Sequence, residues 1–253
     1  LLNNARKATY GSNLGAASPG MTKMYSHGIA TMALCEALAL TRDEALRPTA
    51  TDCIRYIINA QHQRGGWRYE PRQPGDTTVT GWQLMALKSA EMAGIDVPTP
   101  VWTRAGQFLD SVATSAGSRY GYTSPGEGLT TTSIGLLMRM YLGWDRLHGA
   151  LELGASFVAG RGPSQTDMYF NYYTTLALHH IRNDEWERWN PKMRDYLVQT
   201  QERNGHERGS WHFHDHHGQQ GGRLYTTCMA IMTLEVYYRY LPLYGWPEDW
   251  PNR

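Results

Sequence analysis

Five stretches of the chain share one pattern of polar and apolar positions. Each opens with small or hydroxyl-bearing residues and then places apolar side chains three and four positions apart, which is the spacing of a helix with a buried face. Few charges interrupt them, so we expect helices that are apolar almost all round. The stretches are residues 25–38, 76–90, 129–142, 171–181 and 224–238.

The five stretches form a repeat of about fifty residues, a period typical of stacked helical hairpins. When His27, Thr78, Thr132, Thr175 and Thr227 are taken as equivalent, the steps between them are 51, 54, 43 and 52 residues. Three positions further on, four of the five stretches carry a small residue. A small residue at this position lets neighbouring helices approach closely.

A second set of helices is predicted between the first. These segments are apolar on one face and carry Arg, Asp, Lys or Gln on the other, which fits an outer layer. They are residues 51–63, 102–114, 151–160 and 191–203. Pro48, Pro98, Pro100 and Pro191 stand near their starts, where a first helical turn tolerates proline. Alternating β-branched residues, the signal of a strand, are scarce.

These patterns predict an all-α fold of about five helical hairpin repeats, with inner and outer helices. We expect a single domain over residues 1–253, with repeats from about 25 to 244, a lead-in over 1–24 and a tail over 245–253. Such a stack either extends as an open solenoid or closes into a ring, and the period fits both.

Composition excludes several classes of protein. The 253 residues are 41% hydrophobic and 19% charged, as in a globular chain, and the net charge of +1 gives no reason to expect a nucleic-acid partner. No apolar run is long enough for a transmembrane segment. Cys35, Cys53 and Cys228 lie far apart in apolar segments, so we expect buried free thiols.

The aromatic residues are unusual in kind, with 16 Tyr and 9 Trp against 4 Phe. Rings with a polar atom suit positions that are apolar on one side and hydrated on the other. Two interpretations stay open. One is a core whose ring edges are hydrogen-bonded, and the other is a cavity whose rings hold a small apolar or saccharide ligand.

Two turns that follow predicted outer helices carry a shared motif. Residues 61–69 read QHQRGGWRY and residues 201–213 read QERNGHERGSWHF, while 117–123, GSRYGYT, have Tyr120 in place of the tryptophan. The first turn fits the Gln…Gly-x-Trp repeat of the squalene–hopene and oxidosqualene cyclases, and the second fits it with a longer gap. With five repeats around these turns, the chain resembles the terpenoid cyclase and protein prenyltransferase superfamily.

The resemblance implies an α/α toroid, in which inner and outer rings of helices surround a central cavity. The resemblance does not extend to the catalytic acid of the cyclases. Class II cyclases protonate their substrate with the middle Asp of Asp-x-Asp-Asp-Thr. Aligning Trp82 with the tryptophan of bacterial members puts Asp76 on the final Asp and Gly75 on the acid. A register one residue away makes Asp76 the acid itself.

The zinc site of the prenyltransferases is also incomplete in this chain. Against their Asp-x-Cys and Tyr-His-Thr-Cys units, Asp76 and Cys228 are kept, but Thr78 replaces the cysteine and Thr226 replaces the histidine. The Cys-Gly-Glu-Gln element of thioester-domain toroids is absent. We therefore expect no metal and no cofactor.

Asp76 follows Pro74-Gly75 and opens an apolar stretch, so its simplest role is that of a helix N-cap. The starts of the inner helices should meet at one end of a toroid, where their free N–H groups favour a polar or anionic ligand. Asp76 is therefore the candidate catalytic residue. The candidate ligand-binding residues are Glu70, Arg72, Thr78, Trp82, Asp167, Tyr172, Tyr173, His212, His214, Arg223 and Tyr225.

The histidine-rich segment 210–227, SWHFHDHHGQQGGRLYTT, leaves three roles open. It can form a solvated loop at the rim of the cavity, and one of its histidines can serve as a general acid or base. His212, His214 and His216 can also bind a metal from one side of an extended segment. The Gly and Gln residues around them favour the loop.

Two classes of function follow from these observations. The first is a binding module, which holds a small ligand or a protein partner without the family's acid or zinc. The second is an enzyme with a different apparatus at the same place. That enzyme is either an isoprenoid cyclase that uses Asp76 as acid or a polysaccharide-processing enzyme, since some pectate lyases share the fold.

Overall fold

The structure is a computed structural model of the chain, and it describes residues 5–9 and 11–236. Within this part the fold is predominantly helical, as predicted, with nine α-helices and two small two-stranded sheets. The chain divides into two compact units, Leu1–Glu127 and Gly128–Arg253. No helix among the described residues is long and apolar enough to cross a membrane.

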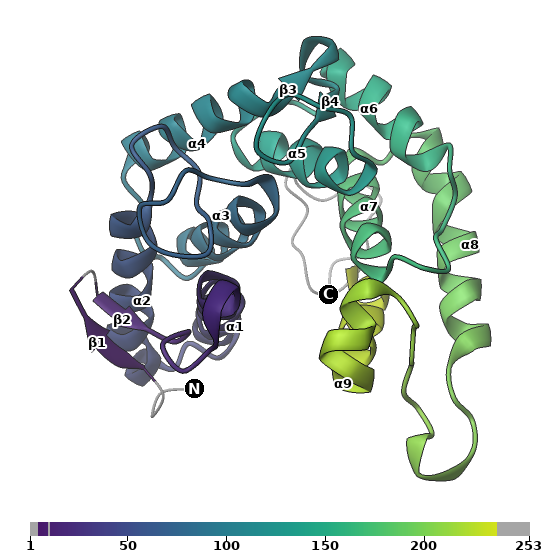
Figure 1. Ribbon diagram of the computed structural model, residues 1–253, viewed down its shortest axis with the longest axis horizontal. Coiled ribbons are helices and arrows are strands. Elements are labelled where there is room, and N and C mark those ends of the chain that lie inside the picture. Colours follow the sequence, from purple (N-terminus) through teal and green to yellow (C-terminus); the bar gives the residue numbers. More distant parts are fainter. Residues whose placement is uncertain (1–4, 10, 237–253) are drawn as a thin grey trace. The chain divides into compact units, whose positions relative to one another are not determined.

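The first unit combines two predicted inner helices with two predicted outer helices (Figure 1). α1 and α3 lie side by side, α2 packs on both of them, and α4 packs on α3. The helices are α1 (Lys23–Thr41), α2 (Arg47–Ala60), α3 (Thr77–Met92) and α4 (Thr99–Val112). The shorter elements are η2 (Gly20–Thr22), η3 (Glu44–Leu46), β3 (Ala113–Thr114), η4 (Ser115–Gly117) and β4 (Arg119–Tyr120).

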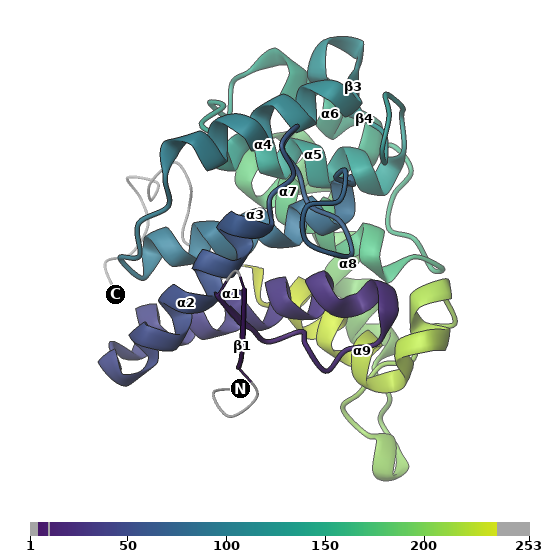
Figure 2. The same ribbon diagram turned by 60° about the vertical axis from the view of Figure 1, so that its left-hand side comes forward.

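A short hairpin precedes these helices and lies against α2 (Figure 2). In it β1 (Arg6–Ala8) pairs antiparallel with β2 (Gly11–Asn13). Asn13 donates a hydrogen bond to the Tyr56 hydroxyl at 3.0 Å. Gly11 is required at the contact, because its φ is +131° and a Cβ would lie 2.4 Å from the Asp52 carbonyl oxygen. The strands were not predicted, since three residues are too few to show alternation.

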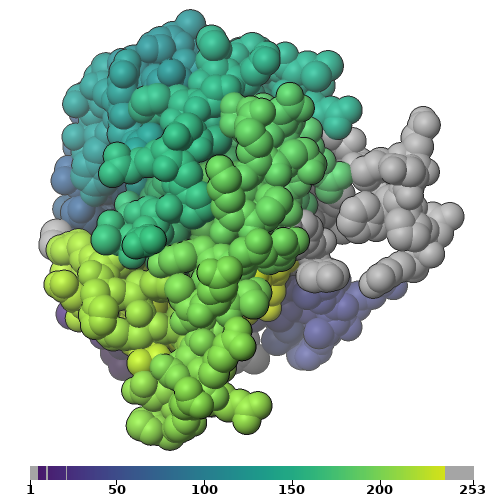
Figure 3. All heavy atoms as spheres, turned by 90° about the vertical axis from the view of Figure 1, so that its right-hand side faces the viewer, coloured from purple at the N-terminus to yellow at the C-terminus, as the bar shows by residue number. Residues whose placement is uncertain are grey.

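The second unit places three predicted inner helices next to one another in the order α5, α7, α9 (Figure 1). α6 packs on α5 and α7, and α8 packs on α7. The helices are α5 (Leu129–Tyr141), α6 (Gly149–Ala159), α7 (Met168–Ile181), α8 (Asp184–Thr200) and α9 (His216–Leu234). The loop after α8 contains η5 (Gly205–Glu207), and Figure 3 shows it projecting beyond the end of that helix.

Three of the predicted inner helices are buried as expected. Every residue of α7 is buried, as are most residues of α3 and α5, because these helices are covered on several sides. The expectation does not hold for α1 and α9, which bury fewer than half of their residues. α2 and α8 bury one face and expose Arg, Glu, Asp or Lys on the other, as predicted for outer helices. The prediction of a helical fold is therefore confirmed for each unit.

The predicted position of Pro191 near a helix start is wrong. α8 begins at Asp184, so Pro191 lies inside the helix. The stronger start signal is Asn183, whose side chain accepts a hydrogen bond from the Glu185 N–H and which precedes an acidic first turn. These capping interactions outweigh the loss of one helical hydrogen bond at the proline.

α9 also begins earlier than predicted. Its first turn starts at His216, inside the segment that was expected to be a loop, and the inner helix proper follows a break at Gly222. Gly222 has φ 64° and ψ −164°, a conformation that residues with a side chain rarely adopt.

The prediction of three buried thiols holds for two of them. Cys35 and Cys53 are buried, and burial raises the pKa of each thiol to about 12. Cys228 is exposed, so the prediction is wrong there. It lies on a face of α9 with Leu224 and Ile231, whose side chains are also exposed.

Candidate functional site

Asp76 is the N-cap of α3, as predicted. Its Oδ1 accepts hydrogen bonds from the Val79 N–H and the Thr78 hydroxyl, both at 2.8 Å. Its own N–H donates to the Trp67 carbonyl oxygen at 2.9 Å, which ties the helix start to the preceding turn. Gly75 is needed at this point, because a Cβ there would lie 2.9 Å from the Cα of Gly66.

The second carboxylate oxygen of Asp76 has no hydrogen-bond partner, although the residue is 0% exposed. The nearest cation is Arg68, whose Nε lies 3.9 Å from Oδ2. Burial raises the pKa of Asp76, and the hydrogen bonds from Val79 and Thr78, the nearby Tyr122 hydroxyl and the charge of Arg68 offset this only in part. A buried acceptor left unpaired is costly, so this oxygen distinguishes the site.

Three tyrosines surround this carboxylate. The Tyr25 hydroxyl lies 2.6 Å from the Thr78 hydroxyl, and the hydroxyls of Tyr69 and Tyr122 lie 2.7 Å apart. Because Thr78 donates its proton to Asp76, Tyr25 donates to Thr78. Burial, helped by the negative charge of Asp76, raises the pKa of Tyr25, and burial with the bond to Tyr69 raises that of Tyr122. Both phenols therefore stay protonated at neutral pH.

An open pocket of about 260 Å³ is lined by Arg68, Tyr69, Gln73 and Pro74, of which Arg68 lies 3.9 Å from Asp76. The Arg68 guanidinium covers the Tyr69 ring, with 5.2 Å between its Cζ and the ring centroid. Gln73 is oriented by its Oε1, which accepts a hydrogen bond from the Glu70 N–H at 3.2 Å. The pocket therefore combines an aromatic wall, a cation and a fixed amide.

The other predicted residues of the first unit have mainly structural contacts. Glu70 forms an ion pair with Lys23 at 2.7 Å. Arg72, in a left-handed conformation with φ 65°, donates from Nε to the Asn59 carbonyl oxygen at 2.7 Å at the end of α2. Trp82 is buried in α3. Thr78 is the predicted binding residue that donates a hydrogen bond to Asp76.

Two further aspartates begin inner helices in the second unit. Asp167 caps α7 through the Phe170 N–H and accepts from the Thr130 hydroxyl at 3.3 Å. Asp215 caps α9 through the Gly218 N–H, and its other oxygen accepts from the Met168 N–H at 2.9 Å. Unlike Asp76, each uses both of its carboxylate oxygens.

Tyr172 and Tyr173 are fully buried in α7, and their ring centroids lie 5.0 Å apart. His212 and His214 are exposed, with 4.5 Å between their ring centroids. Asp215, next to them, is occupied by backbone N–H groups on both oxygens. Over the described residues, no group of three or more His, Cys, Asp or Glu side chains converges where it could hold a metal ion.

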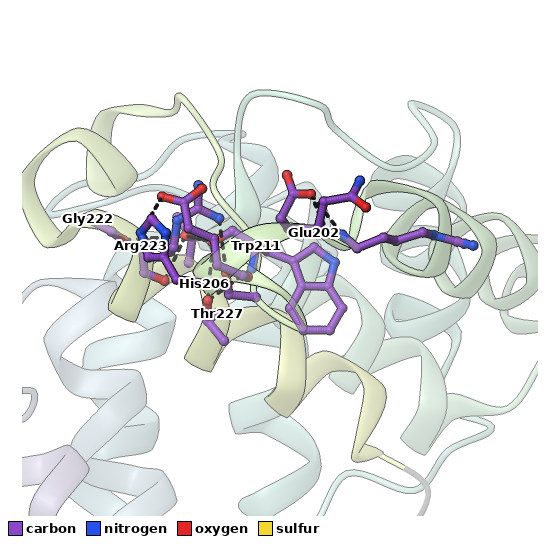
Figure 4. Close-up of polar contacts among 11 residues, drawn as sticks. Glu202, His206, Trp211, Gly222, Arg223 and Thr227 are labelled. Carbon is purple, nitrogen blue, oxygen red and sulfur yellow. Dashed lines mark hydrogen bonds and ion pairs between the residues drawn. The ribbon is translucent and has the colours of Figure 1, made fainter.

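The Trp211 turn is a closed network of polar contacts (Figure 4). The indole N–H of Trp211 donates to the Leu197 carbonyl oxygen at 2.8 Å, and its backbone N–H donates to the Thr227 hydroxyl at 3.1 Å. Arg223 pairs with Glu207 at 2.8 Å and donates to the Ser210 hydroxyl at 3.0 Å. Tyr225 lies beside His217, with ring centroids 6.2 Å apart.

The Trp67 turn repeats the same framework. Its indole N–H donates to the Ile57 carbonyl oxygen at 2.8 Å, and its backbone N–H donates to the Thr80 hydroxyl at 2.9 Å. Gln61 ties this turn to the next outer helix, donating to the Val101 carbonyl oxygen at 3.0 Å and accepting from Arg104 at 2.9 Å. Gln61 thus fastens one repeat to the next, and Trp67 joins α2 to α3.

These contacts correct the predicted repeat register. Thr80, rather than Thr78, is the equivalent of Thr227, because each accepts from the tryptophan N–H and donates to its carbonyl oxygen. Four residues earlier, Asp76 in the first turn then corresponds to Arg223 in the second. Runs of adjacent hydroxyl residues made the shift invisible in the sequence.

Six residues of the site are not among the candidates from the sequence, namely Tyr25, Arg68, Tyr69, Gln73, Pro74 and Tyr122. Arg68, Tyr69 and Tyr122 lie in turns that carry the tryptophan motif or its tyrosine variant, and the excess of Tyr over Phe indicated rings at a polar boundary. The contacts of Tyr25 and Tyr122 with this turn are long-range, so no local pattern indicates them.

Comparisons with protein-family models, with curated proteins and with solved structures found no match to this chain. Arguments about its function therefore rest on the chain's own residues.

Proposed function

We propose that this protein is a ligand-binding α/α repeat protein of the terpenoid cyclase and prenyltransferase type, without the family's acid triad or zinc site. The observation that carries the proposal is the pocket of Arg68, Tyr69, Gln73 and Pro74, whose arginine lies 3.9 Å from a buried carboxylate with an unpaired oxygen. A concave site with one aromatic wall and a few fixed polar groups is typical of small-molecule binding.

Binding is favoured over catalysis by where the reactive groups lie. Arg68 and Tyr69 line the pocket, whereas the side chain of Asp76 is 0% exposed and is not part of the lining. An acid must reach the proton's destination within hydrogen-bond distance, and in this arrangement Arg68 meets a ligand first.

The proposal includes closure of the inner helices into a ring. It is supported by the layering within each unit, where α1 lies beside α3, and α7 lies between α5 and α9, with outer helices packed behind them. A ring and an open superhelix differ in maximum dimension, so small-angle X-ray scattering tests this part. A particle much longer than a ring of this mass contradicts it.

Native mass spectrometry of protein purified under mild conditions tests the binding function. We expect a bound small molecule on the wild type, its loss from Gln73→Trp, which fills the pocket, and its retention by Gln63→Trp, an exposed position in the preceding turn. A wild type that carries no added mass, or a Gln73→Trp variant that keeps it, contradicts the proposal.

Two observations favour a second candidate function, an isoprenoid cyclase that uses Asp76 as acid. Burial raises the pKa of Asp76, and its Oδ2 has no partner, both of which suit a neutral carboxylic acid that donates a proton. Incubation with a linear isoprenoid tests it. Turnover that is abolished by Asp76→Asn establishes the cyclase and displaces the binding proposal.

A further inference from the structure

Arg68 is the main charged group on the wall of the pocket, and its hydrogen-bonding capacity is largely unused. Its side chain is 36% exposed, and its contacts are the 3.9 Å approach of Nε to Asp76 and the packing over Tyr69. A guanidinium has five N–H donors in a planar fork that matches a carboxylate. The terminal N–H groups of Arg68 are therefore available to a ligand.

Gln73 adds donors of the same kind. Its Oε1 already accepts from the Glu70 N–H, so its remaining polar group is the amide NH₂, with two donors. The acidic side chains nearby do not oppose this. Glu70 is paired with Lys23 at 2.7 Å, and the carboxylate of Asp76 is shielded from solvent. The pocket thus offers hydrogen-bond donors and one positive charge.

The rest of the wall suits a single ring. Pro74 presents an aliphatic side chain and Tyr69 the part of its ring that Arg68 does not cover, and both can pack against a flat apolar group. About 260 Å³ is at the small end for a ligand pocket, which excludes a long chain lying wholly inside.

We propose that this pocket binds a small monocarboxylate that bears one ring, with the carboxylate on Arg68 and Gln73 and the ring against Tyr69 and Pro74. The inference rests on the proposed binding function and narrows it to one chemical class. Asp76 attracts the Arg68 guanidinium at 3.9 Å and so helps to hold it in place, which makes Asp76 a positioning residue.

An NMR titration with benzoate and benzamide tests the inference, since the two probes have the same size and ring and differ in charge. For the wild type at neutral pH, we expect benzoate to shift the amide signals of Tyr69 and Gln73 with a dissociation constant of about 1 mM, a plausible value for so small a ligand. We expect benzamide to bind at least about tenfold more weakly, which corresponds to the loss of one charge-assisted contact.

Three variants complete the test. Arg68→Gln should weaken benzoate binding about tenfold or more, Arg68→Lys should weaken it less because the charge remains, and Arg64→Gln, an exposed arginine in the same segment, should leave it unchanged. Unchanged amide signals elsewhere show that a variant is folded. Equal affinity for benzoate and benzamide at the same amides overturns the inference but leaves the binding function standing. Failure of both probes to bind also overturns the inference, and the mass-spectrometric test then decides the binding function separately.

Discussion

The Trp67 turn and the Trp211 turn share the same hydrogen bonds of tryptophan and threonine, but carry opposite charges at one equivalent position. In both, a tryptophan indole is bonded to an outer-helix carbonyl, and its backbone is bonded to a threonine of the following inner helix. Four residues before that threonine stands Asp76 in the first turn and Arg223 in the second. Each meets a partner of opposite charge from its own turn, Arg68 or Glu207.

The two ion pairs differ in how complete they are. Arg223 and Glu207 touch at 2.8 Å, both are partly exposed, and Ser210 accepts a further hydrogen bond from Arg223. Arg68 stays 3.9 Å from a fully buried Asp76, whose second oxygen has no hydrogen-bond partner. The tryptophan and threonine therefore join the helices in both turns, while the charged position differs: its ion pair is complete in the Trp211 turn and incomplete in the Trp67 turn.

The largest loss of stability should come from replacing the tryptophans that the two turns share. Trp67→Ala and Trp211→Ala should each lower the free energy of unfolding by about 3–5 kcal/mol, because each removes a large buried ring and a buried hydrogen bond. Trp→Phe at either position keeps most of the ring and should cost less. Urea denaturation measures these losses, and a cost below about 1 kcal/mol at one site would mean that the two turns do not share the framework.

Acid should weaken the first unit through His27. Its Nδ1 accepts from the Leu14 N–H at 3.1 Å and its Nε2 donates to the Cys53 carbonyl oxygen at 3.1 Å, so protonation at Nδ1 breaks a bond and buries a charge. Burial lowers the pKa of His27 from 6.5 to about 4, so its stabilising contribution is complete above pH 6.5 and is lost as the pH falls through 4.

The loss associated with His27 is on the order of 3 kcal/mol, at about 1.36 kcal/mol for each pKa unit. Unfolding measured from pH 7 to pH 4 should show it, and His27→Gln should flatten the profile. The second unit should respond on its own account, because burial lowers the pKa of His179 to about 4 and that of His180 to about 3. A His27→Gln profile as steep as that of the wild type contradicts the assignment.

Replacing the capping aspartates Asp215 and Asp76 by asparagine should change the free energy of unfolding differently at the two positions. Asp215→Asn should destabilise the protein by about 1–2 kcal/mol, since both oxygens of Asp215 accept backbone N–H bonds and an amide can accept only with one. Asp76→Asn keeps the cap and removes a buried charge with a raised pKa, so at neutral pH it should be neutral or stabilising by about 1 kcal/mol. Equal losses for the two variants would remove the distinction between the turns.

The smallest effect should come from the ion pairs themselves. Glu207→Gln should cost no more than about 1 kcal/mol, because both partners are partly exposed. Arg68→Gln should cost no more than that in stability, although it should weaken carboxylate binding about tenfold or more. Thermal unfolding of the two variants measures this, and a loss of several kcal/mol for Arg68→Gln would identify Arg68 as a structural residue.

The helices and the Trp turns could be predicted because their signals are local. Apolar spacing marked the nine α-helices of residues 11–236, and the Gln…Gly-x-Trp motif marked the Trp67 turn. The N-cap at Asp76 was also predicted, since a turn, an aspartate and an apolar helix follow one another directly.

The surroundings of Asp76 could not be predicted because they depend on register and on long-range contacts. Tyr122 approaches the Asp76 carboxylate from a later turn, and no local sequence pattern predicts this contact. Adjacent threonines allowed Thr78 to be aligned where Thr80 belongs, and only the tryptophan contacts remove that ambiguity. Asp215 lay among histidines, which drew attention to metal chemistry and away from its role as a cap.

Because the three thiols differ in exposure, their chemical modification reports when the first unit unfolds. A maleimide reagent at neutral pH should modify folded protein once, at Cys228, because Cys35 and Cys53 are buried and strongly protonated. Both shielded thiols belong to the first unit, on α1 and α2. A second or third maleimide added to the protein mass therefore shows when the buried thiols of that unit become exposed, and no engineered label is needed.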